Sequence, residues 1–247
     1  MKNLLLTLLV ISSNTSLINA QDAQSLLKEI VAEVGGVEAM HELKDVSFDY
    51  ARGETVYKER YVFDGEISWG KSTLKDGTTR IQFFDGKDVE VWDNGKKSDD
   101  EKAIQSAMFS RKTNYYWLAM IQKMADPGLV ATYGGKRMFE GIEYDLLDVT
   151  YEDGVGVAKD RYLLYVNPYT KLVDQFLFTV AAVGRQDPIM MKYSYDTFAG
   201  GVKFPVVAQS RAALNWEGEL DPEAKWSARS RTNFRFNNGY NLKSILK

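Results

Sequence analysis

The chain has 247 residues, of which 45% are apolar and 13% aromatic, and its formal net charge is −3. This length and composition suffice for one sizeable core, and the weakly acidic balance argues against a nucleic-acid partner, which would require a basic domain. There is no cysteine and a single histidine, His41, which excludes disulfides, thiolate metal sites and metal sites built on several histidines.

The N-terminus has the pattern of a secretory signal peptide. One lysine is followed by an apolar run, Leu4–Ile11, and by small and polar residues that end at Ala20. This run is far shorter than the ~20 residues that span a bilayer, and no later segment is long enough. We therefore expect a signal peptide over residues 1–20 and a single soluble domain over residues 21–247. A cysteine-free exported chain fits the bacterial periplasm.

Two kinds of element are predicted in the first hundred residues. An amphipathic helix is expected over Asp22–Val34, ended by Gly35-Gly36, with one or two further turns to Leu43. Apolar residues then alternate with polar ones from Val46 to Trp92. The turns of this segment are marked by four dipeptides that favour tight turns, which predicts an up-and-down antiparallel sheet. The dipeptides are Asp64-Gly65, Asp76-Gly77, Asp85-Gly86 and Asn94-Gly95.

A central helical segment separates two blocks of predicted strands. Ser98 and Glu101 have the spacing of a capping box and predict its start. Thr113 or Asn114 is expected to restart the helix, and Asp126-Pro127-Gly128 is expected to end it. Because it lies between the two blocks of strands, this segment is the natural cover for the concave face of a curved sheet.

Three antiparallel strands are predicted over Ile142–Val180. The apolar phase flips at Leu146–Leu147, so we expect a bulge there or a strand that bends from one cover to another. Glu152–Val157 supplies the glycines of the following turn. Arg161–Val166 is apolar on both faces, which is typical of a central strand, and Asn167–Thr170 forms the next turn.

The last strands are predicted at Ile189–Tyr195, Val202–Val206 and Trp226–Phe236. Pro205 cannot donate to a ladder, so its strand is expected at an edge. In the final strand, Phe234 and Phe236 are expected to face inward, and the arginines outward. These arginines are Arg229, Arg231 and Arg235.

Candidate chemistry is sparse. His41 stands in no recognisable serine-type triad. A pair of carboxylates is enough for a glycosidase, and Glu140, Glu143, Asp145 and Asp148 are close in sequence. Glu143 and Asp145 alternate with apolar residues, however, as solvent-facing strand positions do. The aromatic excess, with five Trp, 14 Tyr and 12 Phe, is compatible with an ordinary β core and equally with an apolar cavity for a lipid-like ligand.

Four segments resemble the LolA/LolB-like periplasmic lipoprotein carriers and the related outer-membrane lipoprotein-sorting proteins. They are the end of the first helix with the residues that follow it, a Phe-Asp-Gly hairpin, a strand–turn–strand around Asn-Pro-Tyr-Thr, and a closing Gly…Phe-Pro motif. In this sequence they are Gly35–Val46, Phe83–Lys97, Tyr162–Phe178 and Tyr195–Pro205. The resemblance implies a mainly β fold with helical cover, in which a strongly curved antiparallel sheet or unclosed β-barrel carries an N-terminal helix and a central helical lid. It also implies an apolar cavity able to take acyl chains.

On this basis we expect a periplasmic binding protein for a lipid or lipoprotein acyl chain, acting as a carrier or sensor in the cell envelope. The alternatives are a carboxylate-dependent hydrolase acting in the sheet groove and a ligand-free envelope adaptor. We expect a monomer with no cofactor, no metal and no catalytic residue, not membrane-spanning, with envelope proteins as possible partners. The residues predicted to line the cavity are Trp69, Phe83, Val91, Trp117, Ile121, Tyr144, Phe176 and Phe178.

Overall fold

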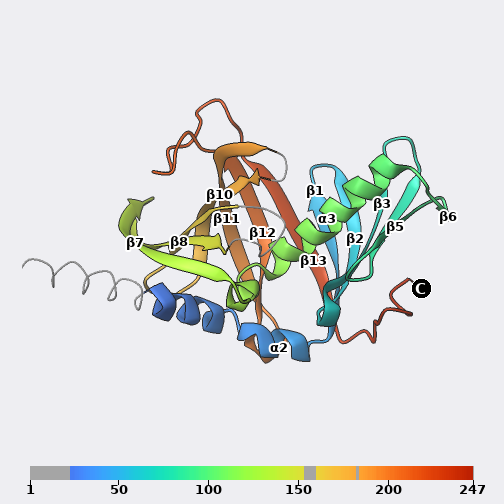
Figure 1. Ribbon diagram of the computed structural model, residues 1–247, viewed down its shortest axis with the longest axis horizontal. Coiled ribbons are helices and arrows are strands. Elements are labelled where there is room, and N and C mark those ends of the chain that lie inside the picture. The colour runs from blue at the N-terminus through green and yellow to red at the C-terminus, as the bar shows by residue number, and fades with distance from the viewer. Residues whose placement is uncertain (1–22, 153–159, 182–183, 247) are drawn as a thin grey trace, which may run out of the picture. The chain divides into compact units, whose positions relative to one another are not determined.

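The computed structural model describes residues 23–152, 160–181 and 184–246 (Figure 1). The strands assigned in these residues form one 13-stranded sheet in the order β6-β5-β4-β3-β2-β1-β13-β12-β11-β10-β9-β8-β7. The order starts at β6 and ends at β7, so the sheet is unclosed. The predicted fold class is confirmed: a curved, unclosed antiparallel sheet with an N-terminal helix and a central helix. The predicted signal peptide and most of the turn at Glu152–Val157 lie outside the described residues.

Most elements fall where the sequence pattern predicts them. The strands are β1 (Asp45–Arg52), β2 (Thr55–Val62), β3 (Ile67–Thr73), β4 (Thr79–Phe84), β5 (Val89–Asp93), β6 (Lys96–Lys97), β7 (Leu129–Phe139), β8 (Ile142–Tyr151), β9 (Tyr162–Val166), β10 (Val173–Val180), β11 (Arg185–Thr197), β12 (Lys203–Ala212) and β13 (Ser227–Phe236). The helices are residues 23–33, α2 (Gly36–Glu42) and α3 (Glu101–Ala119), with short 3-10 turns η1 (Asp64–Glu66), η2 (Gln122–Ala125) and η4 (Ala199–Gly201). None of the helices within the described residues is long and apolar enough to cross a membrane.

The chain divides into two compact units. The described part of the first unit comprises residues 23–33, 124–152, 160–181, 184–192 and 210–225, and so contains β7–β10. The second unit comprises Val34–Lys123, Tyr193–Gln209 and Trp226–Lys247, and so contains α2, α3, β1–β6 and β13.

The first helix ends at residue 33, just before the predicted stop at Gly35, whose φ is +92°. A Cβ at this position would lie 2.9 Å from Cα of Val202. Glycine is therefore needed here twice, for the left-handed conformation and for the close approach of the backbone. The sharp turn starts α2, which buries Met40 in the core of the second unit.

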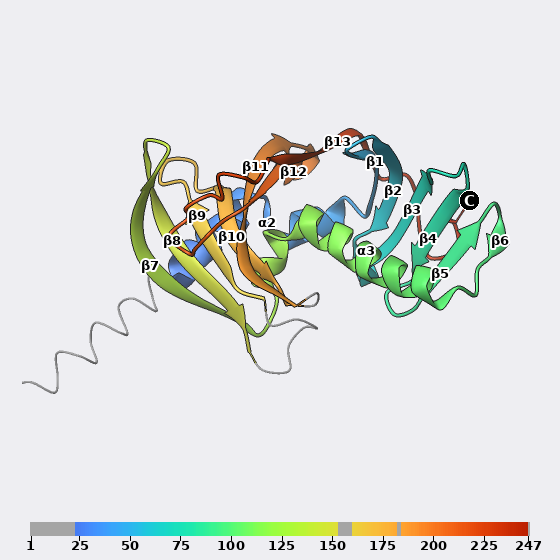
Figure 2. The ribbon, with the colours of Figure 1, turned by 90° about the horizontal axis from the view of Figure 1, so that it is seen from above.

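Helix α3 lies across β3, β4 and β5 of the second unit (Figure 2). Its N-cap is Asp100, whose carboxylate accepts a hydrogen bond from the backbone N–H of Lys102 at 2.9 Å. The predicted capping box at Ser98 is therefore wrong, because the chain enters the helix two residues later. The predicted restart at Thr113 or Asn114 is also wrong, since α3 runs through both residues and ends at Ala119.

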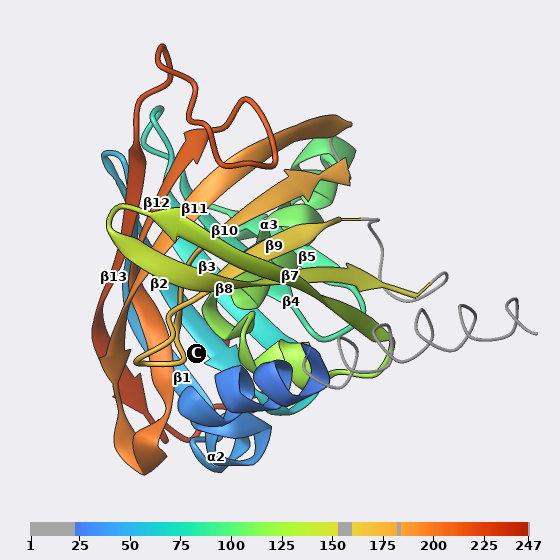
Figure 3. The same ribbon diagram turned by 90° about the vertical axis from the view of Figure 1, so that its left-hand side faces the viewer.

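The first unit contains one strand that the sequence pattern did not reveal. β7 is interrupted by a register shift between Tyr133 and Lys136, where Gly134 and Gly135 break the alternation. β8 pairs with β9 without any shift, and the two strands lie side by side in Figure 3. Leu146 and Leu147 therefore face opposite sides of the sheet, and both are buried. The expected bulge in β8 is thus wrong, because the bulge is in the neighbouring strand. β9 is buried on both faces, as predicted.

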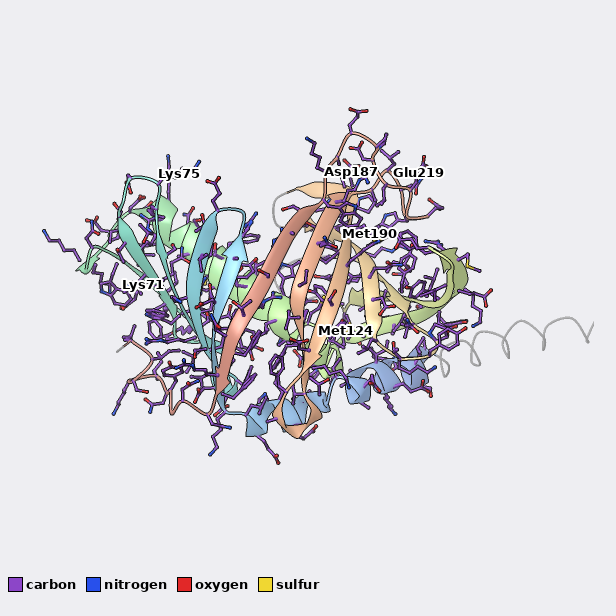
Figure 4. All side chains as sticks on the ribbon, turned by 180° about the vertical axis from the view of Figure 1, so that it is seen from behind. Lys71, Lys75, Met124, Asp187, Met190 and Glu219 are labelled. Carbon is purple, nitrogen blue, oxygen red and sulfur yellow. The ribbon has the colours of Figure 1, made fainter. Side chains whose placement is uncertain are left out.

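Within the first unit, the segment Ser210–Lys225 packs against one face of the strands β7, β9 and β11. Arg137 donates hydrogen bonds to the Tyr165 hydroxyl and to the carbonyl of Trp216, each at 2.8 Å. Gly218 lies directly over Tyr165 and Met190. Figure 4 labels Met190 on β11 and Glu219 in this segment. One face of the first unit is therefore already covered by the chain itself.

Candidate functional site

The sheet of the second unit has two faces that differ in their cover. Cross-strand register places Glu59, Gly70, Gln82 and Val91 opposite one another on the face under α3, which we call the α3 face. The same register places Arg60, Trp69 and Phe83 on the other face. The C-terminal residues Tyr240 and Ile245 pack on that other face, which we call the C-terminal face.

A buried ion pair joins α3 to the sheet. Nη1 of Arg111 lies 2.5 Å from Oε2 of Glu59, and Nη2 lies 2.9 Å from Oε1, while both side chains are almost completely inaccessible to solvent. Gln82 accepts a further hydrogen bond from Nε of Arg111 at 3.2 Å. Burial disfavours the charged form, but the Glu59 carboxylate outweighs it and raises the pKa of Arg111. The pair is therefore fixed as a salt bridge with two parallel hydrogen bonds.

Gly70 makes room for this ion pair. A Cβ on Gly70 would lie 2.2 Å from Nη1 of Arg111 and 2.5 Å from its Cζ. The guanidinium thus lies flat against the β3 backbone, at a point where any side chain would displace it. A glycine inside a strand usually weakens it, so its presence here indicates a close approach.

The first half of α3 contributes little apolar surface to its own docking. Its fully buried residues before Arg111 are Ala103 and Ala107, which pack against Val91 together with the half-buried Ile104. Larger buried side chains, Tyr115 and Leu118, occur only in the last turns, where they join the main core of the second unit. This part of α3 is therefore held to the sheet mainly by small side chains and one ion pair.

A bulge in β13 reverses the predicted orientation of two arginines. Val46 pairs with Phe236, whereas Tyr50, on the same face of β1, pairs with Arg231, five residues away. The odd separation is absorbed at Asn233, which has φ +60°. Arg229 and Arg231 therefore share a face with Phe236, and the expectation that they point outward is wrong. Arg235, beyond the bulge, is exposed as predicted.

Arg231 is 4% exposed, and its Nη1 donates to the carbonyl of Pro205 at 2.7 Å. Its guanidinium lies 5.3 Å from the ring centroid of Tyr50. The prediction that the strand of Pro205 lies at an edge of the sheet is wrong. That strand, β12, lies between β11 and β13. Pro205 stands near the start of β12, where a missing donor interrupts the ladder least.

Aromatic side chains of β1, β2 and β11 share the α3 face with Arg231. The Tyr50 and Tyr57 rings are 5.9 Å apart, the Tyr193 and Tyr195 rings are 5.8 Å apart, and the Tyr193 hydroxyl donates to the carbonyl of Trp117 on α3 at 3.2 Å. Burial raises the pKa of Tyr50 and of Tyr193, although nearby arginines oppose the shift, so both phenols are neutral donors at physiological pH. We call this set the arginine–tyrosine cluster, and it consists of Tyr50, Tyr57, Trp117, Tyr193, Tyr195, Arg229 and Arg231.

The predicted cavity residues of the second unit are divided between its two faces. Val91 lies under α3, Trp117 is half-buried on α3, and Ile121 is buried in the segment that follows. Trp69 and Phe83 lie together on the C-terminal face, in contact with Ile245. These five residues therefore do not form one lining, and ligand contact by any of them stays a prediction.

The three predicted cavity residues of the first unit are also divided between two faces. The rings of Phe176 and Phe178 lie 5.7 Å apart and both contact Tyr162. Tyr144 instead packs against Tyr165 on the opposite face and donates to Asp174 at 3.1 Å. Burial, followed by the charge of Asp174, raises the pKa of Tyr144 to about 12. Whether any of the three contacts a ligand stays a prediction.

The carboxylates considered for hydrolysis each have a basic partner. Glu140 pairs with Lys192, Asp148 with Arg161, and Asp145 with Lys136, while Glu143 lies 4.0 Å from Lys136. Asp145 and Asp148 project from opposite faces of β8, because they are three residues apart in a regular strand. The structure thus distributes these carboxylates among separate ion pairs.

Neither charged feature of the α3 face could be recognised from the local sequence pattern. Glu59 was visible only as an interruption of an alternating apolar pattern, and Arg111 only as a polar residue in the helix. Glycine at position 70, inside a strand, was the one local signal of a close approach. Nothing local identified Arg231, because its burial depends on a bulge at Asn233, between Arg231 and Phe236.

A family model described as a family of unknown function, DUF6503, matches residues 71–211. The chain belongs to this family. The matched DUF6503 region runs from β3 to β12 and includes α3, whereas β1, β2 and β13 lie outside it. A search of curated proteins finds no match.

Several solved structures are similar to this DUF6503 chain. A LolA superfamily protein from Nitrosomonas europaea has 13% identity and a TM-score of 0.47, covering 87% of this chain and 94% of its own. A DUF1329 family protein from Desulfovibrio piger has 14% identity and a TM-score of 0.48, covering 86% and 95%. A putative outer membrane lipoprotein-sorting protein domain from Vibrio parahaemolyticus has 10% identity and a TM-score of 0.43, covering 83% and 94%. The superfamily that the sequence resembles is thus found again among similar structures, but at these scores the similarity carries no argument about function.

Proposed function

We propose that this protein binds one acyl chain of a lipid or lipoprotein on the α3 face and acts as a carrier or sensor in the cell envelope. The observation that carries the proposal is the way α3 is attached. Before Arg111 its only fully buried residues are Ala103 and Ala107, beside the half-buried Ile104, so separating that part of the helix from the sheet exposes less apolar surface than separating its last turns would. Helices in proteins depend on such burial for most of their stability.

The aromatic side chains beside α3 suit an apolar ligand. Trp117, Tyr57 and Tyr195 are half-buried, so each keeps part of its ring accessible next to the covered face. Each methylene that a ligand buries contributes about 0.8 kcal/mol. One acyl chain on these rings would therefore bind usefully even after the costs of association. The resemblance of the sequence to the LolA/LolB-like carriers points in the same direction.

The test is a titration of the delipidated protein with a dansyl-labelled fatty acid. We expect one saturable site, and we expect Trp117→Gln to weaken binding. Phe109→Gln is the matched control, because Phe109 is on the same helix but 45% exposed, and it should leave binding unchanged. Absence of saturable binding by the folded wild-type protein would overturn the proposal and leave the ligand-free adaptor as the better account.

The proposed location follows from the N-terminal sequence. Residues 1–20 are proposed to direct export to the periplasm and to be removed near Ala20. N-terminal sequencing of the protein from its native envelope should find a start near Gln21. Recovery of the intact Met1 start from a membrane fraction would contradict this.

A further inference from the structure

Arg231 is a buried cation on the α3 face without an anionic partner. Among the described residues its only hydrogen-bond acceptor is the carbonyl of Pro205, and no carboxylate forms an ion pair with it. Buried arginines are normally paired, because removing a charge from water is costly. The cation–π contact with Tyr50 compensates only part of that cost.

The Glu59 carboxylate on the same face is already engaged. Both carboxylate oxygens of Glu59 accept hydrogen bonds from the guanidinium of Arg111. The same face thus carries one arginine with a complete carboxylate partner and another with none. A bound anion would neutralise the charge of Arg231 and accept its hydrogen bonds, as the Glu59 carboxylate does for Arg111.

Other donors lie around Arg231. Arg229 precedes it on the same face of β13, and burial lowers the pKa of Arg229. Tyr50, whose ring lies beside the Arg231 guanidinium, is only 6% exposed. Neutral phenol and guanidinium groups are both good donors to an oxyanion.

We propose that Arg231, together with Arg229 and the Tyr50 hydroxyl, binds the anionic headgroup of the acyl ligand. The headgroup chemistry is an oxyanion, either the carboxylate of a fatty acid or the phosphate of an alkyl phosphate or phospholipid. This inference rests on the proposed acyl-binding function and adds the orientation of the bound ligand. The chain lies against Trp117 and the half-buried tyrosines, and the charged end lies at β13.

Binding of three ligands of equal chain length tests the proposal, with isothermal titration calorimetry as the measurement. The ligands are dodecanoic acid, dodecyl phosphate and dodecanol. Hydrogen bonds to charged groups are worth roughly a tenfold to hundredfold change in affinity. We expect the wild-type protein to prefer at least one of the two anions over dodecanol by about this factor, and the preferred anion identifies the headgroup.

Variants of the cluster decide whether Arg231 is responsible. Arg231→Met should remove the preference while affinity for dodecanol is retained, and Arg231→Lys should keep part of it. Tyr50→Phe, which preserves the ring, should reduce anion affinity alone. Arg235→Met is the matched control on the same strand, since Arg235 is exposed beyond the bulge, and it should keep the full preference.

The outcomes separate the headgroup site from the function on which it rests. Equal binding of acid, phosphate and alcohol to the wild-type protein would overturn the headgroup site and leave acyl binding intact. A preference that survives in Arg231→Met would also overturn it. If Arg231→Met does not fold, an unchanged preference in both Arg231→Lys and Tyr50→Phe would overturn it. Failure of all three ligands to bind would overturn the acyl-binding function itself.

Discussion

The two faces of the β2–β4 sheet in the second unit are covered in different ways. On the α3 face, a 19-residue helix is attached through two buried alanines, the half-buried Ile104 and the buried Arg111–Glu59 pair before its last turns reach the core. On the C-terminal face, Ile245 and Tyr240 pack on Trp69 and Phe83. There, Arg60 lies over both the Trp69 and Tyr240 rings and donates to the carbonyl of Ile245 at 2.9 Å.

The difference indicates different roles. Apolar packing is non-directional, and its contribution to stability is proportional to the apolar area that it buries. We therefore interpret the C-terminal cover as a contribution to stability. A buried ion pair contributes little net stability against an apolar alternative but fixes one geometry. We therefore interpret the α3 face as the functional face and the C-terminal face as its support.

The largest expected effect comes from breaking the buried pair on the α3 face. Arg111→Met leaves the Glu59 carboxylate buried without a partner and should cost about 3–5 kcal/mol of unfolding free energy. Urea denaturation measures this. In the double variant Glu59→Met/Arg111→Met most of the stability should return. A double variant no more stable than Arg111→Met would show that the loss arises from packing and not from the unpaired charge.

A smaller effect is expected from crowding the same pair. Gly70→Ala places a methyl group against the Arg111 guanidinium and should cost about 1–3 kcal/mol, which is typical of overpacking. The atoms nearest to the added methyl group all belong to Arg111. The cost in unfolding free energy should therefore largely disappear in an Arg111→Met background. Denaturation midpoints of the four proteins of this double-mutant cycle give the coupling. Additive costs would contradict the close approach described for Gly70.

On the C-terminal face, a conservative change should affect stability alone. Ile245 is fully buried, so Ile245→Val should cost about 0.5–1.5 kcal/mol. Affinity for the fatty-acid probe should stay at the wild-type value, because this face is not the proposed binding face. A variant with normal stability and weakened binding would reverse the assignment of the two faces.

The smallest effect is expected from a partly exposed ion pair, which contrasts with the buried one. Arg80 forms two hydrogen bonds to Asp93, at 2.7 and 2.6 Å, and these hold the pKa of Asp93 below its ordinary value. A lowered carboxyl pKa stabilises the fold above the unfolded-state pKa, and this stability is lost as pH falls through the folded-state pKa. Asp93→Asn should therefore cost less than about 1 kcal/mol at neutral pH and nothing in strong acid. A pH-independent difference between the two proteins would show that the pair is not the cause.

The sequence predicted the features that depend on neighbouring residues. The Asp-Gly and Asn-Gly dipeptides located the turns of the β1–β6 meander, and the continuous apolar run at Tyr162–Val166 identified a strand buried on both faces. Helix α3 was predicted as a cover, although its start was misplaced because Asp100, and not Ser98, caps it.

The features that the sequence did not predict depend on distant partners. The bulge at Asn233 moves Arg231 from the solvent side to the covered side, and a period-two pattern cannot show where the register slips. The pairing of Arg111 with Glu59 joins residues 52 positions apart. The eight predicted cavity residues were chosen as large apolar side chains, which does not distinguish the two faces of a sheet buried on both sides.

Photo-crosslinking tests the central claim most directly. A diazirine-bearing fatty acid would be bound to the wild-type protein, activated by light, and its adducts mapped by peptide mass spectrometry with and without excess unlabelled fatty acid. The account predicts adducts that the unlabelled acid competes away in α3 around Trp117, in β1 around Tyr50 and in β11 around Tyr193. Competed adducts confined to Trp69, Phe83 and the C-terminal residues, or no competed adduct anywhere, would contradict it.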